Sequence, residues 1–324
     1  MSAKRSPFSP SKPSAHGRRQ FKAGLRCYAP LVDLAALQVQ HWLWLGALCA
    51  VACAHAWATR SARNALHAPP AWKAWAFLAA LVATGAATAS PIERLGNDVL
   101  WVNFLGFLLI TMIAAPLFVL SSPLTLAFRA SGRTGRRRLR RLYCSRIVTL
   151  LSFPAITWLG FAATTYAWQF SPLTEFAAQN VLVRTLQLST LLVVALLFWW
   201  PALGCDPIRV RLNHPLRVFY VGVEMVHKGL FGGMFLSMTS PIHDHFANTT
   251  VSWAPPPMAD QRIAILILWI GGNLIFVVAL VALAIQWMRY EARNTVRVDR
   301  RLEQHREAIR QRRAALDQVF HKGV

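Results

Sequence analysis

Long apolar runs separated by short polar segments dominate the pattern of hydrophobic and polar positions along the chain. A helix needs about 20 apolar residues to cross a bilayer, and seven runs approach or reach that length. They lie at about residues 41–58, 72–89, 99–120, 147–168, 181–200, 216–238 and 263–288. The pattern predicts an all-α fold, a polytopic transmembrane helical bundle of about seven spans within residues 31–288.

The third apolar run is longer than one straight crossing. It continues from Val99 to Phe128, and Pro116 and the Ser121-Ser122-Pro123 segment interrupt its second half. Proline lacks the backbone N–H that a helix interior needs. We therefore expect a spanning helix followed by a bent or re-entrant segment that is buried against protein.

Basic segments predict the orientation in the membrane. Residues 1–30 are rich in Ser, Pro, Lys and Arg and are expected to be a disordered basic tail. Residues 129–146 hold the densest arginine cluster, which favours the cytoplasm and would bind anionic lipid headgroups. Residues 289–324 carry charges at helical spacing and are expected to form a basic cytoplasmic helix or tail. Seven spans with a cytoplasmic C-terminus put the N-terminus outside.

Composition excludes an ordinary soluble domain and argues against nucleic acid as a partner. Of the 324 residues 55% are hydrophobic, and the mean hydropathy is +0.37. The net charge of +22 could suggest nucleic-acid binding. The basic residues, however, cluster between and after the apolar runs, which is typical of membrane topology. We expect membrane lipid as a partner and no nucleic acid.

The run at 216–238 carries ionisable residues at mid-depth. Glu224, His227 and Lys228 lie three and four residues apart, so a helix places them on one face where the carboxylate can reach both bases. A charge at this depth costs roughly 2.5 to 3.5 kcal/mol, so this face is expected to point into the bundle. The cluster is either a structural polar contact between helices or a proton or ion pathway of a transporter or channel.

Soft metal donors follow the same run. They are His227, Met234, Met238, His243 and His245, all close in sequence and on the predicted outer side. Imidazole and thioether groups are suitable ligands for copper, so a copper site is one interpretation. In the other, the methionines fill apolar packing and the two loop histidines are solvated. The sequence contains no recognisable catalytic constellation, so no catalytic residue and no enzyme are predicted.

Three segments share a pattern of prolines, tryptophans and polar residues. They are residues 114–126 with Pro116 and Pro123, residues 197–204 with Trp199, Trp200 and Pro201, followed by Asp206, and residues 259–262 with Asp260 and Gln261. Together they resemble the CtaG family of cytochrome c oxidase assembly factors in its caa3-type form, over roughly residues 90–290. The resemblance implies a non-enzymatic, multi-pass protein of the bacterial inner (plasma) membrane. It would act on a haem-copper oxidase subunit, in copper-centre maturation or as a scaffold.

The chain departs from that family at its histidine motifs. The family has His-Met-x-x-His where this chain has residues 103–107, which begin with Asn103 and end with Phe107. A further histidine pair of the family is replaced by Arg184 and Leu188. Phenylalanine and leucine offer no metal donor, and the permanently charged arginine repels a cation. The chain resembles a divergent member in which copper is not expected at these positions.

Overall fold

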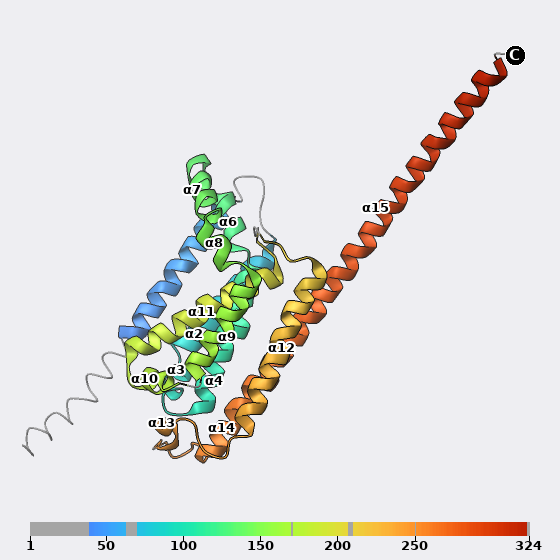
Figure 1. Cartoon of the computed structure of the whole chain (residues 1–324). Coiled ribbons are helices and arrows are strands. Elements are labelled where there is room, and N and C mark those ends of the chain that lie inside the picture. Colours follow the sequence, from blue (N-terminus) through green and yellow to red (C-terminus); the bar gives the residue numbers. More distant parts are fainter. Residues whose placement is uncertain (1–38, 63–69, 170, 207–209, 250, 323–324) are drawn as a thin grey trace, which may run out of the picture.

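The computed structural model describes residues 39–62, 70–169, 171–206, 210–249 and 251–322, with side chains to residue 312. Every regular element in these residues is a helix, and the helices lie side by side as a bundle (Figure 1). The predicted fold class, an all-α helical bundle of membrane type, is confirmed. The predicted tail of residues 1–30 lies outside the described residues.

The first half of the chain contributes helices to the bundle and to both of its ends. Its helices are Val39–Ala62, α2 (Ala71–Thr88), α3 (Pro91–Leu95), α4 (Leu100–Leu108), η1 (Leu109–Ala114), α5 (Ala115–Leu120), α6 (Pro123–Ala130), α7 (Arg133–Tyr143) and α8 (Arg146–Leu151). The second half begins with α9 (Pro154–Gln169), α10 (Leu173–Gln179), α11 (Val181–Leu203) and α12 (His214–Leu236). It ends with α13 (Asp244–Ala247), α14 (Pro257–Leu266), η2 (Ile267–Gly271) and α15 (Gly272–Lys322).

Five helices in the described residues are long and apolar enough to cross a membrane. They are Val39–Ala62, Ala71–Leu95, Leu100–Ala130, Val181–Leu203 and Pro257–Arg312. The other two predicted runs fold as α8 with α9 and as α12, which pack in the same bundle. Helix α9 has only 16 residues, and α12 carries Arg217, Glu224 and Lys228. The number of spans, seven, therefore stays a prediction.

A π-helical turn lets the third run continue through Pro116. At the end of η1 the backbone N–H of Ala115 donates to the carbonyl of Ile110, five residues earlier. Of the two interruptions that the sequence suggested, the one at Pro116 is absent, whereas the one at Ser121 and Ser122 is present as a turn between α5 and α6. Ser122 has a φ of 55°, in the left-handed region, and the proline at the start of α6 follows it directly.

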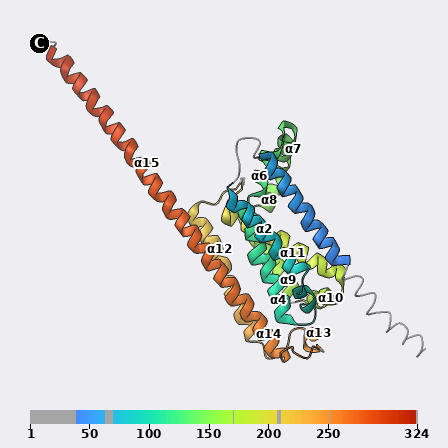
Figure 2. The ribbon, with the colours of Figure 1, turned by 180° about the vertical axis from the view of Figure 1, so that it is seen from behind.

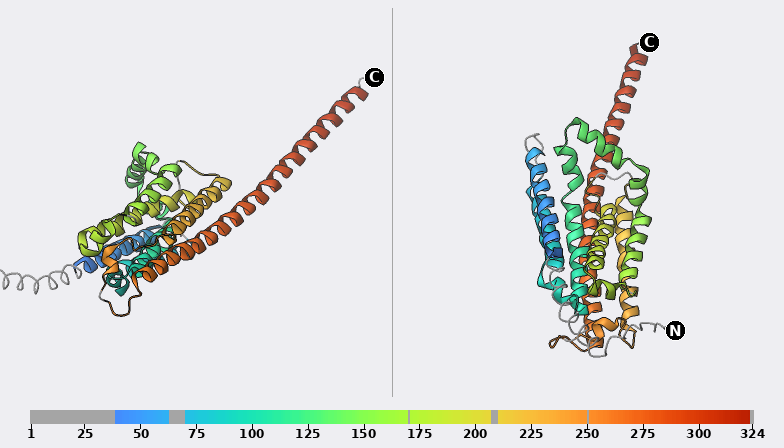
Figure 3. Two further views of the ribbon diagram at one scale, coloured as in Figure 1. Left: turned by 60° about the horizontal axis from the view of Figure 1, so that its bottom comes forward. Right: turned by 90° about the vertical axis from the view of Figure 1, so that its left-hand side faces the viewer.

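The two ends of the bundle differ in charge. Helices α6, α7 and α8 lie at one end, and α15 extends beyond the bundle from that same end (Figures 1 and 2). Helices α3, α10 and α13 lie at the opposite end (Figure 1), and a second direction of view gives the same arrangement (Figure 3). The arginine-rich α7 and the C-terminal helix are therefore on one side, as the predicted cytoplasmic location of both requires.

Candidate functional site

The tryptophan and proline motifs meet at the π-helical turn. Because Ala115 bonds to Ile110, the next bond in that register would join Pro116 to the carbonyl of Thr111, and proline has no N–H to donate. The indole Nε1 of Trp199 donates to this carbonyl at 2.9 Å. Both Trp199 and Thr111 are fully buried, so without this hydrogen bond the carbonyl of Thr111 would be buried and unpaired, which would be costly. The motif on α11 thus completes the helix that contains Pro116.

The acidic motif caps the start of α4. The carboxylate of Asp260 accepts hydrogen bonds from the backbone N–H groups of Leu100 and Trp101, each at 2.9 Å. The residue before α4, Val99, offers no side-chain acceptor, so Asp260 acts as a cap from a distant part of the chain. Its neighbour Gln261 accepts from the N–H of Ile242 at 3.0 Å. These motif residues therefore join α14 to α4 and to the loop before α13.

A second carboxylate does the same at the other end of the bundle. Asp206 accepts from the backbone N–H groups of Leu124 and Thr125 and from the Thr125 hydroxyl, at 3.2, 2.8 and 2.6 Å. Ser122, in its left-handed conformation, accepts from the Nζ of Lys73 at 2.8 Å. The segment after the first proline motif is thus fixed to α2 and to the loop after α11.

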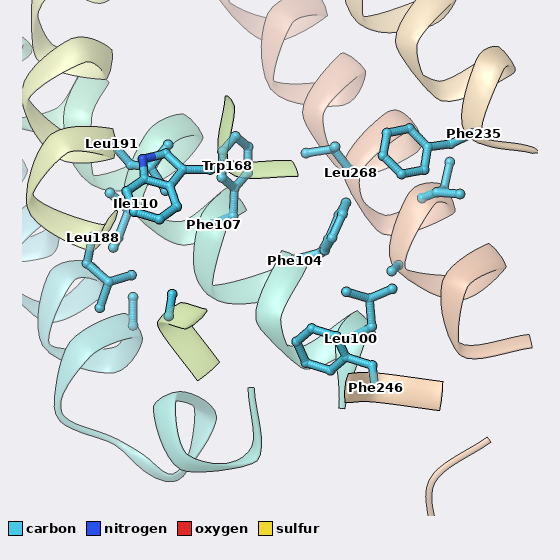
Figure 4. Packing of buried hydrophobic residues seen from close by; sticks show 14 of the residues in the cluster. Leu100, Phe104, Phe107, Ile110, Trp168, Leu188, Leu191, Phe235, Phe246 and Leu268 are labelled. Carbon is cyan, nitrogen blue, oxygen red and sulfur yellow. The ribbon is translucent and has the colours of Figure 1, made fainter. Parts of the chain in front are cut away.

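Apolar packing fills the positions that match the family's histidines. Phe107 and Leu188 belong to one buried cluster, together with Ile110 and Leu191 (Figure 4). Asn103 is also buried, and its amide donates to the carbonyl of Gly96 at 2.9 Å. These side chains offer no imidazole or thiolate donor, so a copper ion does not fit there.

Arg184 is held by polar side chains that the sequence reasoning did not identify. Its guanidinium is 3% exposed and lies 3.9 Å from Oε1 of Glu93, which is 0% exposed. It also donates to Gln187 at 2.8 Å, and the other Glu93 oxygen lies 3.1 Å from Nε2 of His41. The signal that could have revealed this contact is an arginine inside an apolar run, because such a residue requires a buried partner. Local spacing, however, does not say which distant carboxylate provides it.

The two predicted loop histidines bond to backbone carbonyls. His243 Nε2 donates to the carbonyl of Gln169 at 3.0 Å, and its Nδ1 lies 3.7 Å from Glu175. His245 Nε2 donates to the carbonyl of Asn97 at 2.8 Å. Burial lowers the pKa of the His243 imidazole, and this outweighs the opposite effects of Gln169 and Glu175. Both histidines therefore tether the α13 region to its neighbours at the end of the bundle opposite α7.

The other predicted copper ligands lie in different surroundings. Met234 is 44% exposed on α12, whereas Met238 packs against the buried cluster that contains Phe107. The imidazole ring of His227 makes edge-to-face contacts with the rings of Trp158 and Tyr166. No group of three or more His, Cys, Asp or Glu residues in the described part of the chain could hold a metal ion. Copper binding by His227, Met234, Met238, His243 and His245 stays a prediction.

The intramembrane polar cluster is only partly as predicted. Glu224 is 1% exposed and lies 3.2 Å from Nδ1 of His227, but it forms no ion pair with Lys228 within the described residues. The expectation that the carboxylate reaches both bases is therefore wrong for Lys228.

The amino group of Lys228 lies among aromatic rings and beside the start of α15. Its Nζ lies beside Gly272 of α15, 3.5 Å from the position that a Cβ of that residue would take, which is an ordinary van der Waals distance. Three phenyl rings surround the Nζ, those of Phe107, Phe161 and Phe276, with centroids at 5.7, 5.9 and 5.4 Å. Ring faces attract a cation at such distances. The side chain is buried, and its Nζ has no hydrogen-bond partner among the residues that the structure describes.

Comparison with known proteins adds a family to this geometry. The model of the cytochrome c oxidase caa3 assembly factor family (Caa3_CtaG) matches residues 53–290. An uncharacterized protein of Mycobacterium leprae (strain TN) is 28% identical over 246 residues, which cover 74% of this chain and 37% of the relative. An uncharacterized protein of Mycobacterium bovis is 30% identical over 230 residues, which cover 68% of this chain and 34% of the relative.

The chain spans about a third of the length of the curated relatives it matches. No solved structure gives a significant match. The family match includes all three motif segments, whose residues cap α4, close the π-helical turn and fix the α13 loop. On this match the chain belongs to the Caa3_CtaG family of cytochrome c oxidase caa3 assembly factors.

Proposed function

We propose that this chain is a membrane-embedded scaffold that holds an oxidase subunit during assembly in a bacterial inner membrane. In this proposal it does not pass copper through the positions where its family carries histidines, and it catalyses no reaction. Family membership supports the assembly role, and the bundle of apolar helices supports the location in a membrane.

The packing at the family's histidine positions is the observation that carries the proposal. Phe107 and Leu188 are 2% exposed each and share one apolar cluster. Arg184 brings a permanent positive charge to the same end of α11 and is paired with Glu93. A cation would meet phenyl and isobutyl groups and a guanidinium there, and none of these is a ligand.

The alternative function, transport of protons or small ions through Glu224, His227 and Lys228, needs a continuous path of polar groups. In the described residues Glu224 contacts His227, while the Nζ of Lys228 lies among phenyl rings without a hydrogen bond. The path of polar groups is therefore interrupted at Lys228. This geometry favours the structural interpretation of Glu224, His227 and Lys228.

Copper content tests the proposal directly. The full chain, purified in detergent, would be loaded with Cu(I) under reducing conditions, washed and analysed for copper. We expect far less than one copper per chain. The same result is expected for a variant in which His227, Met238, His243 and His245 are replaced. Near-stoichiometric copper that disappears in this variant would contradict the scaffold proposal and support copper delivery by the predicted ligands.

A further inference from the structure

An apolar groove lies between α9 and α12 near the arginine-rich end of the bundle. It is a cavity of about 300 Å³ lined by Pro154, Ala155, Trp158, Leu212, Leu216, Phe219, Tyr220 and Val223. Its floor is formed by the buried Pro154 and Tyr220, whereas Phe219 at its rim is 67% exposed. The groove is thus open toward the surroundings of the bundle and has walls that suit a hydrocarbon chain.

Two arginines lie where this groove meets the end of the bundle. Arg211 precedes the lining residue Leu212 and is exposed, and Arg217 donates from its Nε to the Leu212 carbonyl at 3.1 Å. The two guanidinium groups repel one another. None of the ion pairs between described residues involves either of them. The acidic residues nearest to them along the chain, Asp206 and Glu224, are both buried; Asp206 is bonded to the start of α6, and Glu224 lies 3.2 Å from His227.

This charge arrangement suits an anion from outside the chain. The groove is lined by residues near the starts of α9 and α12. Helix α8, which directly precedes α9, lies at the same end of the bundle as α7 (Figure 1), where arginines at six positions between 133 and 141 mark the predicted cytoplasmic face. The cytoplasmic leaflet presents anionic headgroups at this level, with acyl chains directly beneath them. An apolar groove beside two arginines that form no ion pair with other described residues matches the two parts of such a lipid.

We propose that the groove between α9 and α12 is a binding site for one anionic phospholipid. One acyl chain lies against Trp158, Leu216 and Phe219, and the phosphate pairs with Arg211 and Arg217. The site is separate from the residues that support the proposed scaffold function, so the test of lipid binding and the test of that function can fail independently of each other.

Lipid retention by the purified full chain tests this site. The protein would be reconstituted in vesicles of equimolar phosphatidylglycerol and phosphatidylcholine, extracted in mild detergent, and its retained lipids quantified by mass spectrometry. We expect phosphatidylglycerol to be enriched. Arg211→Gln should reduce the enrichment about five-fold, the factor that ~1 kcal/mol per basic side chain near an anionic surface provides. Arg211 is exposed, so the variant is expected to fold.

Two further variants separate the site from general attraction of lipid to a basic surface. Arg138→Gln removes an equally exposed arginine from α7 and should leave the enrichment unchanged. Ala155→Trp fills the groove and keeps both arginines, so it should lower the retained phosphatidylglycerol. The proposal is overturned if the wild-type chain shows no enrichment, or if Arg138→Gln lowers it as much as Arg211→Gln. It is also overturned if Ala155→Trp has no effect, since the phosphate alone would then explain the binding.

Discussion

Trp199 and Trp200 are neighbours in α11, but only one of their two indole nitrogens has a hydrogen-bond partner among the described residues. Trp199 donates to the Thr111 carbonyl, whereas Nε1 of Trp200 has no hydrogen-bond partner among the described residues. Trp199→Phe should therefore cost about 1 to 3 kcal/mol more than Trp200→Phe, since it strands a buried carbonyl. Thermal unfolding of both variants in detergent measures the difference. Equal losses would mean that Trp199 acts through its size alone.

The ion pair of Arg184 and Glu93 makes a prediction about buried charge. Replacing Arg184 by Met leaves the Glu93 carboxylate without its cation and should destabilise the fold by about 3 to 5 kcal/mol. The double variant Arg184→Met with Glu93→Gln removes both charges and should lose clearly less. Unfolding midpoints in one detergent compare the three proteins. A double variant that is less stable than the single one would exclude this coupling.

His243 should make the α13 end of the bundle sensitive to acid. Burial lowers its folded-state pKa below 6.5, its ordinary value, so the unfolded chain takes up a proton first as the pH falls. The stability from the neutral imidazole is thus fully present above about pH 6.5 and decreases as the pH falls toward the folded-state pKa. The midpoint should drop between about pH 7.5 and 5.5. His243→Gln, which does not titrate, should weaken this dependence, and an unchanged pH profile would contradict the assignment.

At the scale of elements, the remote cap of α4 is the contact most open to test. Asp260 supplies the acceptor for two N–H groups that the helix start cannot satisfy itself. Asp260→Ala should lower the free energy of unfolding by about 2 kcal/mol, within the range for hydrogen bonds to charged groups. Glu291→Ala on the exposed part of α15 is the control and should change it little. Hydrogen exchange at Leu100 and Trp101 should rise in the Asp260 variant only.

The long helices could be predicted from the sequence because apolar runs set their positions, whereas short helices such as α3, α10 and α13 were not predicted. The run at 181–200 became α11, and the run at 263–288 became part of the continuous path from α14 to α15. The π-helical turn before Pro116 could not be predicted, because it depends on the distant donor of Trp199. The surroundings of the Lys228 amino group could not be predicted either, since they include the rings of Phe161 and Phe276 from distant segments.

At the scale of the whole molecule, the motif residues could be recognised in the sequence, but their contacts with distant segments could not. Asp260 and Trp199 were recognised as family-like residues, yet only the fold brings them to α4 and η1. The replacement of the family's histidines was also visible in the sequence. The structure adds that Phe107 and Leu188 belong to one apolar cluster, and that Arg184 forms an ion pair with Glu93. Contacts between distant segments are set by packing, which local patterns do not encode.

The central claim is that the chain holds an oxidase subunit without using copper. The most direct measurement is the amount of oxidase subunit that co-purifies with the tagged full chain from copper-replete and copper-depleted membranes. The scaffold account predicts equal recovery per chain under both conditions, since apolar packing and an ion pair occupy the family's metal positions. Recovery that requires copper, and returns when copper is added to depleted membranes, would contradict it.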